Sequence, residues 1–240
     1  MSLLVPMSGI GVRIRSTGAT TTPSSAVDAA ARAGRQALEQ ARLQPTARID
    51  RLVLSTPAGH AACPEVQDSL PVPPCPTVCI SAGNAGFLHA LDWGARAILT
   101  GEQRALVVAA DECAGAVVLE RGWPEEGLLA LYQTAEGGET FEAMAASARR
   151  ILEEVGLSAG DLRTIIPHRP DSITADRLHD RLDLPRERFF VDEEHPDGLA
   201  GASLAVAFHE AGSRGVLEPG SVVLLLSFAG AALVRWPDPD

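Results

Sequence analysis

Asn84 stands at a position where many enzymes present a nucleophile. It lies at the apex of the small-residue turn "SAGNAGF", between a β-branched run over 77–81 and an apolar helix expected over 84–99. Tight strand-to-helix turns of this kind expose the attacking group, but an amide does not attack a carbonyl. The side chain can hydrogen-bond a ligand, or it can cap the helix, as Asn does well. Both readings stay open from the residues alone.

His168 is the second side chain with a chemistry to offer. It ends a strand expected over 162–168 and is followed by "RPD". With Ser81 and Asp171 it completes the residue types of a hydrolytic triad, but nothing in their spacing supports that grouping. We therefore consider His168 by itself, either as a functional group or as a structural one.

The four cysteines offer thiols but no metal motif. None of Cys63, Cys75, Cys79 and Cys113 forms a C-x-x-C pair, so we expect no metal site. Cys79 falls inside an expected strand, where a cysteine usually acts as a small buried hydrophobe. Cys113 lies at a strand junction and would be a displaced nucleophile only if a basic group lowered its pKa. Its neighbours Asp111 and Glu112 have the opposite effect.

Composition excludes several classes of protein. The 240 residues are 46% hydrophobic and carry a net charge of −11, which leaves no basic face for nucleic acid. No apolar run reaches the roughly 20 residues that span a bilayer, and no secretory leader is visible in "MSLLVPMSGIGVRIR". We expect a cytoplasmic protein with reduced thiols, no cofactor and no membrane partner.

The elements that must position these side chains repeat once along the chain. In the first half we expect strands over 9–15, 49–56, 77–81, 104–111 and 114–120, helices over 26–43 and 84–99, a weak helix near 60–70, and a loop over 16–25 that ends in the N-cap Ser25. In the second half we expect strands over 127–134, 162–168, 185–191 and two within 221–236, and helices within 138–157 and over 172–184 and 201–215.

This order predicts an α/β fold made of two β-α-β-α-β-α-β-β halves, 1–125 and 126–240, within one domain over 1–240. Two helices, 84–99 and 200–212, are apolar all round, so we expect them to be buried between the halves.

Four strings, in this order, resemble the thiolase-fold condensing enzymes, most nearly β-ketoacyl-acyl carrier protein synthase III. They are "CISAGNAGFLHALDWGARAILTG", "AGAVVLE", "IIPHRPD" and "HPDGLAGASLAVAFHEAGSRGVLEPGSVVLLLSFAGAAL". The resemblance covers about 26–236 and implies two five-stranded mixed sheets in a five-layer α-β-α-β-α stack. It places His168 on the family's catalytic histidine and the turn at Gly230 on the family's closing glycine turn.

The departures from the family pattern bear directly on activity. Asn84 stands in place of the nucleophilic cysteine, and Gly198 in place of the asparagine that helps to bind the thioester carbonyl. Oxyanion stabilisation by His168 then lacks its second donor, unless His195 or Asp197 supplies one. The chain is also shorter than the family pattern before the first long helix and between "LVVAAD" and "AGAVVLE", where the family carries cap loops.

Three functions remain open on these grounds. The resemblance implies a protein of fatty acid or polyketide type acyl-thioester metabolism, with the thioester on coenzyme A or on acyl carrier protein. We expect a non-condensing pseudoenzyme that dimerises through the strand near 77–81, either with itself or with an active ketosynthase. The alternatives are an acyltransferase or decarboxylase that uses His168 as its catalytic residue without a covalent intermediate, and a module that shields a carrier-bound acyl chain. Asn84, Gly198 and Gly230 are the candidate substrate-binding residues, and no metal or cofactor enters any of the three.

Overall fold

The computed structural model describes residues 2–4, 9–43, 48–134, 140–194 and 199–237. The first half contains β1 (Ser2–Leu4), β2 (Gly11–Thr20), α1 (Ala26–Gln40), β3 (Arg51–Ser55), α2 (Ala62–Ser69), β4 (Thr77–Ile80), the 3-10 turn η1 (Gly83–Ala85), α3 (Gly86–Leu99), β5 (Arg104–Ala110) and β6 (Ala114–Gly122). The second half contains β7 (Gly127–Gln133), α4 (Phe141–Val155), η2 (Ala159–Asp161), β8 (Leu162–Pro167), α5 (Ser172–Leu182), η3 (Arg186–Arg188), η4 (Ala200–Ala202), α6 (Ser203–Ser213), β9 (Val222–Ser227) and β10 (Gly230–Arg235).

The strands follow one path, β4-β3-β5-β6-β2-β7-β10-β9-β8, with β1 pairing on β7. In its middle the path is held by a single parallel pair, Val12 with Gly127, so the two halves of the path behave as two sheets that face each other. Within the first sheet β3 runs parallel to β4 and β5, whereas β6 runs antiparallel to β5 and β2. In the second sheet β8 runs parallel to β9, whereas β10 runs antiparallel to β9 and β7. Both sheets are therefore mixed, as the fold prediction required.

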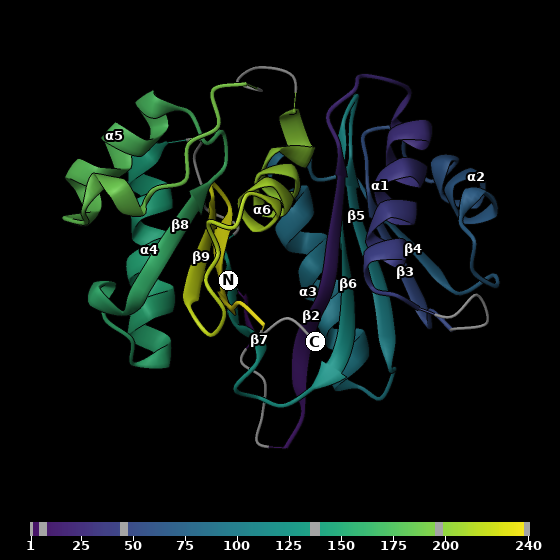
Figure 1. Ribbon diagram of the computed structural model, residues 1–240, viewed down its shortest axis with the longest axis horizontal. Coiled ribbons are helices and arrows are strands. Elements are labelled where there is room, and N and C mark those ends of the chain that lie inside the picture. Colours follow the sequence, from purple (N-terminus) through teal and green to yellow (C-terminus); the bar gives the residue numbers. More distant parts are fainter. Residues whose placement is uncertain (1, 5–8, 44–47, 135–139, 195–198, 238–240) are drawn as a thin grey trace.

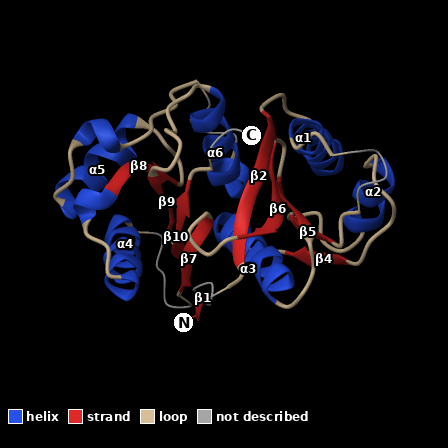
Figure 2. Ribbon diagram, turned by 60° about the horizontal axis from the view of Figure 1, so that its bottom comes forward, coloured by secondary structure: helices blue, strands red, loops and turns tan. Residues whose placement is uncertain are grey.

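The five expected layers are present. Helices α3 and α6 lie between the two sheets, α1 and α2 cover the outer face of the first sheet, and α4 and α5 cover that of the second (Figures 1 and 2). Phe87 and Leu91 of α3 and Leu204 and Phe208 of α6 join one core cluster and are at most 1% exposed. Each such buried side chain contributes about 1.5–3 kcal/mol of apolar burial, so the central layer is a main source of stability.

Strand β2 is longer than the strand that the sequence predicted over 9–15. Residues 16–20, expected as part of a loop, continue β2 and pair with β6 as far as Thr20 opposite Ala114. Gly18 explains the extension, because a Cβ there would lie 2.5 Å from the Ala33 carbonyl oxygen of α1. The helix packs directly on the strand backbone, and the predicted N-cap Ser25 is confirmed by its bond from the Asp28 amide.

The strand expected over 185–191 is the main error in the fold prediction. Residues 186–188 form the turn η3 instead, and only an isolated bridge joins Phe189 to Ile165 of β8. Pro185 precedes the turn with a fixed backbone angle and no N–H to donate to a ladder, which explains why a regular strand does not begin there. Among the described residues, the second sheet therefore consists of β7, β10, β9 and β8, with the three-residue β1 as its fifth strand where 185–191 was expected to contribute one.

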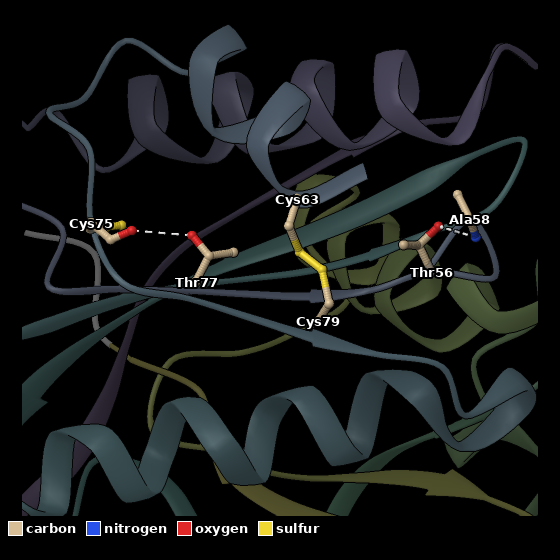
Figure 3. Close-up of a disulfide and its surroundings, with 6 residues drawn as sticks. All are labelled: Thr56, Ala58, Cys63, Cys75, Thr77 and Cys79. Atoms are coloured by element: carbon tan, nitrogen blue, oxygen red, sulfur yellow. Dashed lines mark hydrogen bonds between the residues drawn. A yellow bond between two sulfur atoms is a disulfide. The ribbon is translucent and has the colours of Figure 1, made fainter. Parts of the chain in front are cut away.

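A disulfide joins Cys63 of α2 to Cys79 of β4, with the Cα atoms 6.4 Å apart (Figure 3). The expectation of reduced thiols, and of Cys79 as a simple buried hydrophobe, is therefore wrong for this pair. Sequence spacing carried no signal, because α2 and β4 meet only through the fold. Cys75 lies to the side of the bond, and its thiol donates to Gln67 Oε1 at 3.1 Å.

We expect loss of this bond to lower the free energy of unfolding. The two cysteines are 16 residues apart, and closing a loop of that size restricts the unfolded chain by about 3 kcal/mol. Urea unfolding can compare the oxidised protein with the protein in dithiothreitol and with a Cys63→Ala variant. The last two should unfold at lower urea concentrations than the oxidised protein, and by a similar amount. Cys75→Ser is the control and should match the oxidised protein. Equal stability of the oxidised and reduced forms would contradict the assignment.

Candidate functional site

The turn that carries Asn84 is built on two glycines. Gly83 adopts a left-handed conformation, with φ at +48°, and begins η1, which Ser81 and Ala82 separate from the end of β4. Gly86 opens α3, where a Cβ would lie 2.1 Å from the hydroxyl oxygen of the buried Ser55 at the end of β3. Asn84 between them is half-buried, and the N-cap of α3 is Ala85. The expectation that Asn84 caps this helix is therefore wrong.

The start of α6 lies directly against this turn. A Cβ on Gly201, in η4, would lie 2.9 Å from the carbonyl oxygen of Gly83, so the two backbones nearly touch. Only a residue without a side chain fits this position unless one backbone shifts. The 3-10 turns that lead into α3 and α6 therefore meet at one point, and neither helix carries an acidic side chain in its first turn.

His168 follows β8 and lies behind the start of α6. Its backbone N–H donates to the Leu226 carbonyl at 2.7 Å, and its ring packs edge-to-face on Phe228, with the centroids 5.5 Å apart. The next residue, Arg169, is left-handed with φ at +56°, and its N–H donates to the Ser203 hydroxyl at 3.0 Å. The side chain of His168 is 0% exposed, so in this conformation a substrate does not reach it from solvent.

Gly230 belongs to the same end of the molecule, two residues after Phe228. It begins β10, pairing with Ser227 on one side and Gln133 on the other. A Cβ there would lie 2.2 Å from the Tyr132 carbonyl oxygen, so the close approach of β7 accounts for the glycine. Its role toward a ligand stays a prediction. Gly198, His195 and Asp197 lie outside the described residues.

A continuous chain of contacts thus links the predicted site residues. Asn84 is next to Gly83, which meets Gly201; Ser203 two residues later bonds the residue after His168; and His168 packs on the turn toward Gly230. Two helix N-termini converge here, and their dipoles favour an electron-rich oxygen. The arrangement can hold a carbonyl, but it presents an amide where an attacking thiol would be needed.

The other candidate nucleophiles are engaged elsewhere. Asp171 caps α5 through a 2.6 Å bond from the Thr174 amide, so the Ser81–His168–Asp171 set is not supported as a triad. Cys113 is 3% exposed and donates to the Thr21 carbonyl at 3.3 Å. Burial raises the pKa of the Cys113 thiol, and Glu112 raises it further. This matches the direction expected from the sequence.

Two contributors were not singled out from the sequence. Ser203 and Gly201 lie within the small-residue string "GLAGAS", and this local run of Gly, Ala and Ser was the available signal for a close backbone approach. Within the described ranges, no three His, Cys, Asp or Glu side chains gather as metal ligands would. Nor does any described helix have the length and apolarity to cross a bilayer.

Sequence comparison finds relatives over most of the chain. Residues 152–236 match the family model of the 3-oxoacyl-[acyl-carrier-protein] synthase III C terminal domain. A β-ketoacyl-[acyl-carrier-protein] synthase III of Streptomyces coelicolor is 29% identical, over 97% of this chain and 88% of the relative. A second, from Aquifex aeolicus, is 26% identical over 86% of this chain and 83% of the relative.

The alignment with the Streptomyces protein extends over 299 positions, against 240 residues here, so at least 59 of its positions have no counterpart in this chain. The structure has short connections at both places where the sequence pattern indicated missing loops. Thr21–Ser25 link β2 to α1, and Asp111–Cys113 link β5 to β6.

Solved structures agree on the fold. A 3-oxoacyl-(acyl carrier protein) synthase III, FabH, of Pseudomonas aeruginosa superposes with a TM-score of 0.81 at 22% identity, covering 96% of this chain and 99% of that one. OleA of Xanthomonas campestris superposes with a TM-score of 0.80 at 15% identity, covering 94% and 97%. The chain is thus similar over most of its length to β-ketoacyl-[acyl-carrier-protein] synthases III, and it has the thiolase-like fold of these solved structures.

Proposed function

We propose that this protein is a non-condensing ketosynthase homologue that acts as the partner subunit of an active ketosynthase in acyl-thioester metabolism. The observation that carries the proposal is Asn84, which lies on the glycine-built turn into α3 where a condensing enzyme needs a thiol. Covalent acyl transfer requires a nucleophile that can form and release a thioester, and an amide does neither.

The cysteines of this chain supply no substitute. All four fall within the described residues, and Cys63 and Cys79 are bonded to each other. Burial raises the thiol pKa of both Cys113 and Cys75, which lowers the fraction of reactive thiolate. Cys75 also lies at the far end of β4 from Asn84, beyond Thr77 (Figure 3). No displaced thiol therefore supports condensation.

The edge strand β4 supports the partner role. It ends the strand path and pairs with β3 on one side only among the described strands, and all four of its residues are half-buried. Helix α3 packs against this strand and exposes Trp93, whose accessible fraction is 53%. An open strand edge can pair with a second chain, and an exposed aromatic side chain on the helix that packs against this strand can anchor that chain. A ketosynthase with the same fold would present the matching edge.

The short connections at the two places where the family carries cap loops also support the role of partner subunit. With only Thr21–Ser25 and Asp111–Cys113 at the two places where the family carries caps, this chain has little material there to wall an acyl tunnel. A partner subunit with complete caps would supply that enclosure. The catalytic alternative requires His168 to meet a thioester, and the full burial of its side chain argues against this.

We expect no turnover by the isolated protein. Incubation with malonyl-CoA, with malonyl-acyl carrier protein and with acyl-CoA should release no CO2 above the His168→Ala background, because nucleophile and accessible oxyanion donor are both lacking. Radiometric CO2 release and thioester consumption are the measurements. CO2 release or acyl transfer that is lost in His168→Ala would contradict the proposal and establish the enzymatic alternative.

We expect Trp93→Glu to weaken the association with an active ketosynthase at least tenfold. A buried interface tryptophan typically contributes about 2 kcal/mol or more, and a charge there adds a desolvation cost. Co-purification followed by sedimentation velocity measures the loss.

Trp123→Glu is the matched control. This side chain is 68% exposed and lies between β6 and β7, away from the β4 edge, so its complex should be unchanged. Equal behaviour of the two variants would contradict the interface. A stable homodimer that binds no ketosynthase would contradict the partner role and leave the shielding module as the remaining function.

A further inference from the structure

A pocket of about 470 Å³ lies at the opposite end of α6 from the candidate site. Its walls come from the first half of β2, the end of α1, the last turn of α6 and the end of β10; the residues are Arg13, Ile14, Arg15, Ser16, Thr17, Gln40, Arg42, His209, Gly212, Ser213, Leu217, Pro219, Trp236 and Pro237. Ser203 and Ser213 are the two ends of α6 and lie ten positions apart, which corresponds to about 15 Å along the helix axis. The pocket is therefore separate from the site around Asn84 and His168.

The charge of this pocket is opposite to that of the whole chain. Of the described residues, three arginines and no aspartate or glutamate line it, although the protein carries a net charge of −11. Arg15 donates from Nε to the Ala41 carbonyl at 3.4 Å and lies 4.0 Å from a carboxylate oxygen of Glu120, so it serves the end of α1. Arg13 and Arg42 bring two further cations to the lining from β2 and from the residue pair after α1.

A buried polar pair forms part of the wall. His209 of α6 and Thr17 of β2 are 6% and 5% exposed, and His209 Nδ1 lies 2.9 Å from the Thr17 hydroxyl oxygen. Burial lowers the pKa of His209, so its ring is neutral near pH 7. The bond with Thr17 involves Nδ1, and His209 itself belongs to the pocket lining. The pair gives the wall a fixed hydrogen-bonding group between two elements.

An aromatic face completes the pocket. The Trp236 ring lies so close to Gly212 that a Cβ there would be 3.0 Å from it, and it packs edge-to-face on Phe208, with the centroids 5.4 Å apart. The ring is thereby held in place, with Leu217 and Pro219 also on the lining. Planar and apolar groups bind well to a preformed surface of this kind, and the volume lies in the range typical of small-molecule sites.

We propose that this pocket binds a small organic anion, with a phosphate or carboxylate held by Arg13 and Arg42 and a planar apolar group against Trp236. Arginine suits both acids because its planar fork can donate two parallel hydrogen bonds. The hydrogen-bonding capacity of His209 and Thr17 then selects for polar substituents on the ligand. The proposal does not depend on the function assigned to the Asn84 turn.

Calorimetric titration of the full chain tests the proposal, with phenyl phosphate and benzoate as probes and inorganic phosphate and benzyl alcohol as the two half-ligands. Phenyl phosphate or benzoate should bind at least tenfold more tightly than either half-ligand, and the better of the two identifies the acid. The double variant Arg13→Gln/Arg42→Gln should weaken the better probe at least tenfold, because a charge-assisted hydrogen bond contributes about that much.

Arg177→Gln on α5 is the matched control, since it removes one exposed positive charge far from the pocket and should leave the affinity unchanged. Amide hydrogen exchange provides a second readout that does not rely on the variants folding normally. The better probe should slow amide exchange in residues 13–17 and 209–213 and leave the exchange rates of residues 83–86 unchanged. Absence of saturable binding up to about 10 mM, equal affinity in the double variant, or protection elsewhere would overturn the proposal.

Discussion

The contact between η1 and η4, the 3-10 turns that lead into α3 and α6, is the constraint on which the rest of the structure depends. The backbone of Gly201 approaches the carbonyl of Gly83 so closely that no side chain fits between them. The same requirement recurs where α6 crosses β6, since a Cβ on Gly115 would lie 2.5 Å from the Ala205 backbone. Small residues thus set the thickness of the central layer, and this thickness fixes the distance between the two sheets.

That packing has the thiolase-like fold of the solved synthases, and we propose that the chemistry at residue 84 differs. The turn before α3 still presents residue 84 at a helix N-terminus, and the residue after His168 is still tied to the start of α6 by a hydrogen bond. The glycines and hydroxyls that shape the site are required by the fold itself, so they persist whatever residue 84 is. The fold does not require a nucleophile at position 84, because an asparagine fits this half-buried position.

The sequence predicted the layers and most elements, because apolar periodicity and alternating strands and helices are local properties. It failed where a distant partner decides the outcome. Residues 16–20 look like a loop until α1 packs on Gly18. The bond between Cys63 and Cys79 was equally hidden, since it depends on α2 lying over β4. The strand expected over 185–191 is a different error, because Pro185 is a local signal against regular pairing that the prediction overlooked. Asn84 and His168 could be selected by residue type and place, but the burial of His168 follows only from packing against Phe228.

We propose that the turn at Asn84 keeps the geometry of a nucleophile turn and that only the nucleophile is missing. Intact mass spectrometry of the wild-type protein and of Asn84→Cys, each incubated with a fatty acyl-CoA, tests this most directly. We expect no acyl adduct on the wild-type chain and a single adduct on the variant, mapped to position 84, because a thiol at a helix N-terminus has a lowered pKa. A stable adduct on the wild-type protein, or an Asn84→Cys variant no more reactive than the wild type, would contradict the account.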